Sequence, residues 1–318
     1  IVLDLLSQNK KVCATFTKNS NRSIIKHVFN HYGFSNYYDK VKWIKMDLED
    51  VTEVYQAIKG VDFVYHSGAI VSFNKSDYEQ MRRINIEGTT NIVNACLEHK
   101  IKKLAFISSV ASIGREGKGK YSEKNKWNSR KENSFYALTK YKAENEVWRG
   151  IEEGLNAVIT NPGIIIGPSH WGRSSTTIFK QIHKGLSYFP EGKNGFIDVR
   201  DVARATIALM DSKINRERFI LVGENLPYKS VFDDIALCLN KPKPYKKATK
   251  SLLEIAWRLE AIRCFITNKK QSITKETART ASQINIYENQ KIINALNYNF
   301  KTIKEAISNT SKFLLKVK

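Results

Sequence analysis

The sequence predicts an α/β protein with a doubly wound parallel sheet and a smaller, mostly helical C-terminal lobe. Short apolar runs typical of buried strands alternate with helical segments up to residue 222. Crossovers between parallel strands are right-handed, so this alternation places helices on both faces of one sheet. Beyond residue 225 the pattern becomes helical, with Pro- and Lys-rich connections such as Lys241-Pro242-Lys243-Pro244.

The expected elements follow in alternating order. Apolar runs predict strands at 12–16, 41–46, 63–66, 104–108, 157–160 and 219–222. Helical spacing predicts helices around 23–30, 50–58, 85–97 and 134–148, and then at 228–239, 252–265 and 303–315. Asp201 directly precedes Val202, where a further helix is expected, so we predict that Asp201 caps that helix.

Composition is that of an ordinary globular protein. The 318 residues are 42% hydrophobic, enough for one large domain or two smaller ones. No apolar run approaches about 18 residues and no targeting motif is visible, so we expect a cytoplasmic protein with no membrane partner. The four cysteines are widely scattered, which predicts neither a disulfide framework nor a metal site: Cys13, Cys96, Cys238 and Cys264.

The net charge of +21 would suit a nucleic-acid-binding protein, because cationic surfaces attract phosphate polymers. The lysines, however, are spread along the chain and form no basic block interleaved with aromatic residues. We therefore expect no nucleic-acid partner, although weak, salt-sensitive binding of anions is compatible with this charge.

Tyr136 and Lys140 are the residues that most directly indicate an enzyme. They lie four residues apart on an expected helix, so both side chains can point into one pocket. A free tyrosine titrates near pH ~10, and a neighbouring cation favours the phenolate form. Such a pair is suited to proton transfer in carbonyl–alcohol interconversion.

Two strand ends supply the context for this pair. Phe106-Ile107-Ser108-Ser109 closes one apolar run, and Asn161-Pro162-Gly163 closes another. Open α/β sheets bind their ligands at the carboxyl ends of their strands. A serine hydroxyl there can polarise a substrate oxygen, and Pro162 and Gly163 let the backbone approach a bound ring closely.

These motifs resemble those of the extended short-chain dehydrogenase/reductase family. The resemblance is to its NAD-dependent epimerase/dehydratase group, with dihydroflavonol-reductase-like and 3β-hydroxysteroid-dehydrogenase-like branches. It rests on six ordered segments: 61–69, 85–91, the Ser109 strand, the Tyr136 helix, 161–163 with 167–168, and 196–203. It implies a Rossmann-type dinucleotide-binding domain at 1–163, with 197–224 returning to it, and a substrate-binding lobe formed by 164–196 and 225–318.

The resemblance also implies catalytic roles. Tyr136 would be the general acid/base, while Lys140 would lower the pKa of Tyr136 and hold the nicotinamide ribose. Ser109 would hydrogen-bond the substrate oxygen, because it lies five residues before Gly114 as in the family's pattern, and Ser108 stays open as the alternative. Asn85 would order the active-site water relay, or form a helix-bending hydrogen bond with the backbone.

The implied cofactor is NAD or NADP, and no metal is expected. Asp47, with Leu48, would accept from the adenine amino group, unless Asp47 instead caps the helix that follows it. Residues at two strand ends would line the rest of the cofactor: Ser67, Gly68, Ala69, Asn161, Pro162 and Gly163. The segment 17–22 contains no carboxylate but does contain Lys18, which slightly favours the extra phosphate of NADP. The family itself favours NAD, so the two cofactors stay evenly matched.

One defining motif of that family is absent from this sequence. No glycine-rich turn precedes the helix expected at Ile1–Leu6, and the segment 11–16 resembles a second strand. We therefore interpret the sequence as a fragment that lacks the first strand and the phosphate-binding loop. Because that loop supplies oriented backbone donors to the pyrophosphate, we expect the fragment to bind a dinucleotide weakly.

The expected function is an NAD(P)-dependent oxidoreductase acting on a carbonyl/alcohol substrate. The resemblance favours a ketone or aldehyde reductase of the dihydroflavonol-reductase-like or 3β-hydroxysteroid-dehydrogenase-like type. Two alternatives stay open: a nucleotide-sugar epimerase, and a non-catalytic dinucleotide-sensing or RNA-associated protein. The partner is then a small-molecule substrate, and we expect the Asn85 and Tyr136 helices to pair with those of a second copy in a four-helix homodimer interface.

Overall fold

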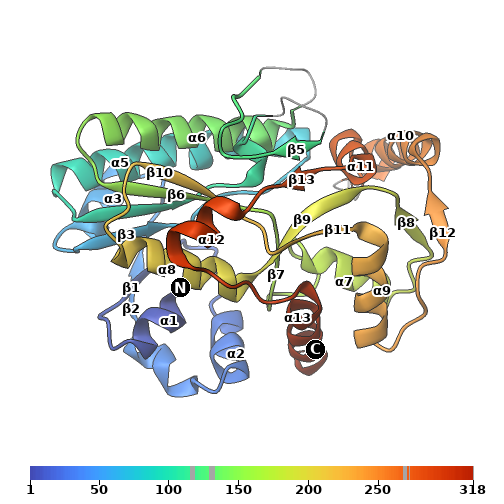
Figure 1. The fold of residues 1–318 in the computed structure, drawn as a ribbon, viewed down its shortest axis with the longest axis horizontal. Helices are drawn as coiled ribbons and strands as arrows, with labels where there is room; N and C mark the ends of the chain where they lie inside the picture. The colour runs from blue at the N-terminus through green and yellow to red at the C-terminus, as the bar shows by residue number, and fades with distance from the viewer. Residues whose placement is uncertain (115–118, 129–132, 268–270, 272, 318) are drawn as a thin grey trace.

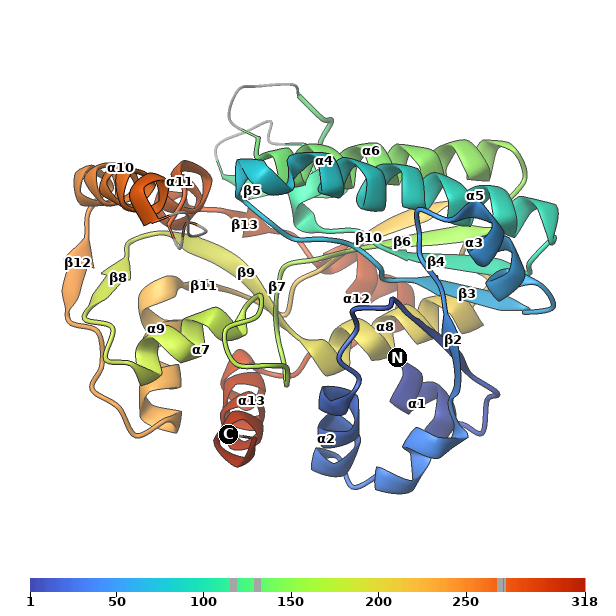
Figure 2. The same cartoon turned by 180° about the vertical axis from the view of Figure 1, so that it is seen from behind.

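A computed structural model describes residues 1–114, 119–128, 133–267, 271 and 273–317. Figure 1 shows a central sheet between two layers of helices, an N-terminal unit below it and a C-terminal lobe beside it. The view from behind in Figure 2 shows the same three parts. None of the described helices combines the length and the apolar character needed to cross a membrane.

The central sheet is parallel, as the apolar runs predict, and it contains four of the six expected strands. Its order is β10-β6-β4-β3, with β3 at Phe63–His66, β4 at Lys103–Ile107, β6 at Ala157–Pro162 and β10 at Glu217–Leu221. Leu104 pairs with Ala157 and Phe106 with Ile159. Every residue of β6 is buried, which explains why this strand is a continuous apolar run and not an alternating one.

Helices cover both faces of this sheet (Figure 1). One layer contains α3 (Val51–Ile58), α5 (Gly88–Glu98) and α6 (Phe135–Glu152), and the other contains α8 (Val199–Asp211) and α12 (Gln290–Leu296). Leu104 and Phe106 pack with the first layer, whereas Ala105 packs with the second. This alternation follows from the pleat of the strand, and it confirms the predicted doubly wound arrangement.

The N-terminal residues form a separate unit. It contains α1 (Val2–Ser7), β1 (Cys13–Phe16), α2 (Ser23–His31), a 3₁₀ turn η1 (Ser35–Lys40) and β2 (Lys42–Lys45). β1 and β2 pair only with each other, so the one continuous sheet that the sequence predicts is divided in two. Within the described residues no strand lies between β1 and β3, and the Phe63 side chain of β3 is accordingly 48% exposed.

The connection from β3 to β4 is helical at first. It runs through η2 (Lys75–Asp77), α4 (Tyr78–Met81) and a π-helical stretch η3 (Arg82–Glu87) before α5 begins. After β4, a 3₁₀ turn η4 (Val110–Ser112) leads toward the short strand β5 (Lys120–Tyr121), which pairs with β13 (Ile286–Tyr287). The π-helix therefore falls where the sequence predicts the start of a regular helix at Asn85.

The C-terminal lobe contains the predicted helices together with small sheets that the sequence analysis missed. The helices are α7 (Thr176–His183), α9 (Tyr228–Cys238), α10 (Lys250–Thr267), α11 (Lys275–Ser282) and α13 (Ile303–Lys316). The strands are β7 (Ile164–Ile166), β9 (Lys193–Asp198) and β11 (Glu224–Pro227) in one sheet, and β8 (Tyr188–Pro190) with β12 (Lys246–Ala248) in another. These strands have three to six residues, too short to show a clear period.

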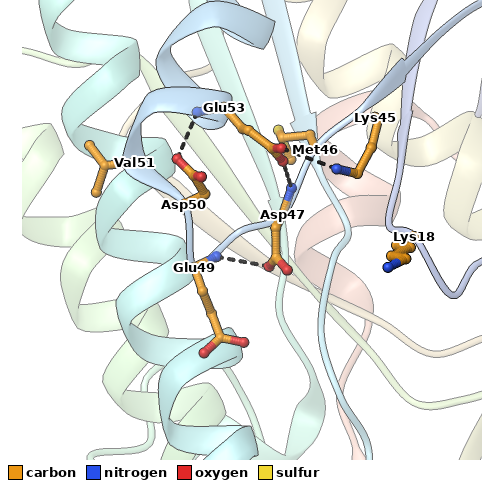
Figure 3. Close-up of a pocket in the computed structure, with 8 residues that line it drawn as sticks. All are labelled: Lys18, Lys45, Met46, Asp47, Glu49, Asp50, Val51 and Glu53. Carbon is orange, nitrogen blue, oxygen red and sulfur yellow. Dashed lines mark hydrogen bonds and ion pairs between the residues drawn. The ribbon is translucent and has the colours of Figure 1, made fainter.

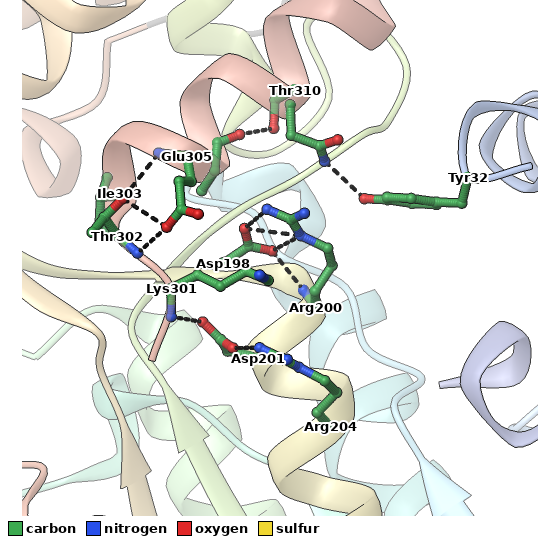
Figure 4. Close-up of polar contacts among 12 residues, drawn as sticks. Tyr32, Asp198, Arg200, Asp201, Arg204, Lys301, Thr302, Ile303, Glu305 and Thr310 are labelled. Atoms are coloured by element: carbon green, nitrogen blue, oxygen red, sulfur yellow. Dashed lines mark hydrogen bonds and ion pairs between the residues drawn. The ribbon is translucent and has the colours of Figure 1, made fainter. Parts of the chain in front are cut away.

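Asp201 fastens the C-terminal segment to α8 (Figure 4). Its carboxylate accepts hydrogen bonds from Tyr298 Oη (3.0 Å) and from the Lys301 backbone N–H (2.8 Å), and it also pairs with Arg204. The prediction that Asp201 caps the helix is wrong. The cap is Asp198, whose Oδ1 accepts from the Arg200 backbone N–H at 2.8 Å.

Candidate active site

Tyr136 and Lys140 lie at the start of α6, which begins beside the carboxyl ends of β4 and β6. The helix begins at Phe135 because Ser134 adopts an extended backbone and its Oγ accepts from the Ala137 N–H at 3.0 Å. This cap places Tyr136 in the first turn of the helix and Lys140 one turn later. The two side chains therefore share one face, as their spacing predicts.

The Ser109 side chain lies near the Tyr136 hydroxyl and favours its phenolate form. The pKa of Tyr136 is nevertheless raised, because burial disfavours the phenolate more than Ser109 favours it. Burial, and not the expected effect of the Lys140 charge, therefore sets the direction of the Tyr136 pKa shift. Phe73 adds to the burial, with its ring centroid 6.1 Å from that of Tyr136.

Lys140 is 2% exposed and donates a hydrogen bond from Nζ to the Ile107 carbonyl oxygen at 2.9 Å. Burial lowers the pKa of its ammonium to about 8, and the negative charge of Glu144 opposes that shift. The Nζ atom also lies 4.4 Å from the centroid of the Phe106 ring. An ammonium has three donors, so the bond to Ile107 leaves two for a ligand such as a ribose diol.

The two candidate serines have different surroundings. Ser109 caps η4, where its Oγ accepts from the Ala111 N–H at 3.1 Å, and its side chain lies near the Tyr136 hydroxyl. Ser108 is 5% exposed, and its Oγ instead donates to Glu144 Oε2 at 2.8 Å. The structure therefore brings Ser109, and not the alternative Ser108, to the Tyr136 hydroxyl.

Asn85 lies in the π-helix η3 and is 1% exposed. Its Oδ1 accepts from the Ile70 N–H at 2.7 Å, while its Nδ2 donates to the Ile70 carbonyl at 2.9 Å and to Thr139 Oγ1 at 3.1 Å. Thr139 in turn donates to the Tyr136 carbonyl at 2.8 Å. Asn85 thus links the chain after β3 to the first turn of α6. π-helical turns occur frequently at functional sites.

Ser67, Gly68 and Ala69 follow β3 directly and are exposed. Gly68 lies against Leu48, because a Cβ atom there would come within 2.9 Å of Leu48 Cδ1. His66, the last residue of β3, is buried, and its Nε2 lies 3.0 Å from Thr89 Oγ1. Burial and the nearby Lys140 charge lower the pKa of His66 to about 3, so this imidazole is neutral and serves packing.

Asn161, Pro162 and Gly163 end β6. Asn161 Nδ2 lies 3.1 Å from the Ser109 carbonyl oxygen, whereas its buried Oδ1 has no hydrogen-bond partner. A Cβ atom on Gly163 would come within 2.5 Å of the Gly195 carbonyl oxygen. Position 163 therefore requires glycine because the backbone of β9 passes close to it.

Asp47 and Lys18 lie at a different place, in an open hollow of about 540 Å³ at the ends of β1 and β2 (Figure 3). The helix α3 is capped by Asp50, whose Oδ1 accepts from the Glu53 N–H at 3.0 Å. Asp47 Oδ1 accepts from the Glu49 N–H at 3.1 Å. The alternative cap role of Asp47 is thus taken by Asp50, and the Asp47 carboxylate faces the hollow.

Three residues near Tyr136 were missed in the sequence. The buried Glu144 forms an ion pair at 3.0 Å with the half-buried Arg218, and the spacing of Glu144 from Lys140 was a signal that could have revealed Glu144. Glu276 Oε1, from α11, accepts from Tyr78 Oη at 3.0 Å and from the Phe135 N–H at 3.4 Å. Sequence spacing gives no signal for Glu276, because its contacts come from distant parts of the chain.

Residues 2–223 match the sequence profile of the NAD dependent epimerase/dehydratase family. The chain belongs to this family. That membership confirms the predicted resemblance and identifies an enzyme family whose cofactor is NAD or NADP. Among the described residues no group of three or more His, Cys, Asp or Glu side chains is placed to hold a metal ion.

Individual relatives within the epimerase/dehydratase family are distant. A putative dihydroflavonol 4-reductase from Synechocystis is 28% identical, over 84% of this chain and 80% of that protein. Sterol demethylase protein B from Methylococcus capsulatus is 26% identical, but only 62% of this chain matches 61% of its length. UDP-glucuronic acid 4-epimerase from Bacillus cereus, solved with UDP-glucuronic acid and NAD, has the same fold, with a TM-score of 0.76, 17% identity and coverage of 100% and 95%.

The residues around Tyr136 fit the nicotinamide end of the family's cofactor. The buried Lys140 ammonium has two donors to spare, and the Asn161 Oδ1 atom is buried without a partner. At the other end, the hollow lined by Asp47 and Lys18 offers both acceptor and donor groups. The first glycine of the given sequence is Gly33, so the glycine-rich turn that precedes the first helix of a Rossmann fold is not among the described residues.

Proposed function

We propose that this chain carries the active site of an NAD(P)-dependent oxidoreductase that interconverts a carbonyl and an alcohol. The observation that carries the proposal is the position of the Ser109 side chain near the buried Tyr136 hydroxyl, with Lys140 one helical turn away. A phenol, a hydroxyl and a cation at the strand ends of a Rossmann-type sheet supply a proton donor, a polarising donor and a positive charge.

The cofactor supplies the hydride when it is bound. The side chains do the rest: Lys140 Nζ holds the ribose hydroxyls with its two remaining donors, and Ser109 Oγ donates to the substrate oxygen. Tyr136 Oη passes its proton to that oxygen as the carbonyl becomes an alcohol. The Lys140 charge then stabilises the phenolate, whose formation burial alone would oppose.

Reduction of a ketone or aldehyde is the reaction we favour, in the manner of dihydroflavonol 4-reductase. In support, the relative that matches 84% of this chain is a putative dihydroflavonol 4-reductase. A nucleotide-sugar epimerase is the alternative, since UDP-glucuronic acid 4-epimerase shares the fold. A non-catalytic dinucleotide-sensing or RNA-associated role is less compatible with a chain that keeps both Tyr136 and Lys140.

The division into a dinucleotide-binding domain and a substrate lobe at 164–196 and 225–318 is part of this proposal, as is a homodimer that pairs α5 and α6 with the same helices of a second copy. A cytoplasmic location and the absence of a nucleic-acid partner are likewise proposed. Free thiols at Cys96 and Cys264, both buried, support a reducing compartment. Light scattering tests the dimer, because a strict monomer at micromolar concentration would exclude it.

The test of the reaction compares two assays on the same preparation. Ketones and aldehydes are incubated with NADH or NADPH and the oxidation of the nicotinamide is followed, while UDP-sugars are incubated with NAD and the products are separated. Reduction that is lost in the Tyr136→Phe variant supports the proposal. Sugar inversion without net nicotinamide turnover would instead identify an epimerase, and activity that survives Tyr136→Phe would refute the assigned site.

A further inference from the structure

The buried Glu144 carboxylate lies directly behind the proposed active site. It is 2% exposed and follows Lys140 by one turn of α6. Four side chains from other elements point donors at it. Glu144 Oε2 lies 2.8 Å from Ser108 Oγ, 2.7 Å from Ser112 Oγ and 2.9 Å from Asn161 Nδ2, and Oε1 lies 3.0 Å from Arg218 Nη1.

Two of these side chains also lie beside the main chain of Ser109. The Ser109 carbonyl oxygen lies 2.8 Å from Ser112 Oγ and 3.1 Å from Asn161 Nδ2. A hydroxyl has one hydrogen, so Ser112 donates either to Ser109 or to Glu144, and an ionised carboxylate is the stronger acceptor. Glu144 therefore fixes the orientation of the two side chains that surround the Ser109 carbonyl.

Glu144 also acts on Lys140 through its charge. Burial lowers the pKa of Lys140, and the Glu144 carboxylate is the charged group that opposes this shift. The other titratable groups facing the ammonium are His66 on β3, which is neutral, and Tyr136 on α6, whose pKa is raised. Neither supplies a negative charge near neutral pH.

Arg218 holds the Glu144 carboxylate in place. Its guanidinium extends from β10 and donates from Nη1 to Glu144 Oε1, while Nε and Nη2 bond the backbone carbonyls of Glu123 and Asn125. A buried ion pair is weak evidence of stabilisation, because the desolvation of both charges offsets their attraction. A well-packed apolar pair would fill the same space, so packing alone does not explain why charged side chains stand here. The charge therefore points to a role in the site.

We propose that Glu144 is a positioning residue for the reaction assigned to Tyr136. It orients the Ser112 and Asn161 side chains that surround the Ser109 carbonyl, and its carboxylate lies one helical turn from Lys140. This inference rests on the proposed function.

The decisive variant is Glu144→Gln, which keeps the shape of the side chain and removes its charge. Turnover should fall by about 10- to 100-fold, with a smaller change in KM, because the group acts on the catalytic set and not on substrate binding. The alkaline limb of the pH–kcat profile should move to lower pH, since Lys140 loses its proton more easily. Glu144→Asp keeps the charge, so it should lose turnover while leaving the alkaline limb near its original pH.

A readout independent of activity is the titration of Lys140 itself. With lysine labelled at Cε, the Lys140 resonance is assigned as the one missing from Lys140→Met, and its pKa is followed by NMR. Glu144→Gln should lower this pKa by about half a unit or more, as loss of a nearby opposite charge does. Glu152→Gln, at the exposed end of the same helix, is the matched control and should leave both the pKa and turnover unchanged.

An unchanged Lys140 pKa and an unchanged pH profile in Glu144→Gln would overturn the proposal, even if urea unfolding showed a loss of stability. If Glu144→Gln does not fold, Ser112→Ala removes one link between Glu144 and Ser109. That variant should lower turnover without moving the alkaline limb, and wild-type turnover in it would overturn the positioning role. Normal turnover in Tyr136→Phe would refute the proposed function instead, so the two failures are distinguishable.

Discussion

Asn85 clamps the backbone of Ile70 from both sides, with Oδ1 accepting from the Ile70 N–H at 2.7 Å and Nδ2 donating to the Ile70 carbonyl at 2.9 Å. The second hydrogen of Nδ2 reaches Thr139, which bonds the Tyr136 carbonyl. One buried amide therefore couples the chain after β3 to the turn of α6 that carries the proposed proton donor. Both hydrogens of the Asn85 amide group are therefore donated in hydrogen bonds.

Asn85→Ala should destabilise the fold by about 2–4 kcal/mol, because it leaves the Ile70 N–H and carbonyl without partners at a buried position. The comparison is Asn91→Ala, which loses one hydrogen bond from Nδ2 to the Leu48 carbonyl at a half-buried site and should cost about 1 kcal/mol. Urea unfolding of both variants provides the measurement. Equal losses would mean that the clamp on Ile70 contributes nothing beyond an ordinary hydrogen bond.

Tyr136→Phe should lower turnover by at least ~100-fold with little loss of cofactor affinity, since it deletes the proton donor and leaves Lys140 in place. Tyr141→Phe is the matched control, because the Tyr141 ring stacks on Trp127, with 4.3 Å between the two ring centroids. Steady-state kinetics and calorimetric titration of NAD and NADP measure the two quantities. Near-normal turnover of Tyr136→Phe would remove the phenol from the mechanism.

Lys140→Met should abolish turnover and yet stabilise the fold by about 1–3 kcal/mol near neutral pH. Burial lowers the pKa of this ammonium from 10.5 to about 8, so the folded state binds the proton less tightly than the unfolded state. Stability of the parent chain should therefore rise with pH between about 8 and 10.5 and be lowest, for this group, below pH about 8.

The gain from Lys140→Met should accordingly be largest below pH about 8 and shrink as the pH approaches 10.5. Urea unfolding at several pH values checks this sign. The exposed Lys142 on the same helix is the control, and Lys142→Met should change stability by less than about 0.5 kcal/mol. A Lys140→Met variant less stable than the parent at neutral pH would contradict the burial argument.

Asp201→Ala should destabilise the chain by about 3 kcal/mol, because it leaves Tyr298, Arg204 and the Lys301 N–H without their shared acceptor. The segment that follows α12 should also become more susceptible to proteolysis, since this carboxylate fastens it to α8. Asp211→Asn, exposed at the end of the same helix, is the control. Unfolding midpoints and mass spectrometry of the cleavage products report the two effects.

The sequence by itself determined the parallel strands of the central sheet, the helices that cover it and the shared helix face of Tyr136 and Lys140. Each of these follows from local periodicity: apolar runs mark the buried strands, and a four-residue spacing places Tyr136 and Lys140 on one helix face. The same spacing carries on to Glu144, so that residue was within reach of the sequence as well.

Only the tertiary structure decided which charges and hydrogen bonds act on those residues. Ser109 and Ser108 are neighbours in the chain, yet one turns toward Tyr136 and the other toward Glu144. Burial raises the pKa of Tyr136, although the adjacent lysine predicts the opposite, because the desolvation of a phenolate depends on everything packed around it. The contacts of Asp201 with Tyr298 and Lys301 join segments about 100 residues apart, and no local pattern records such a pairing.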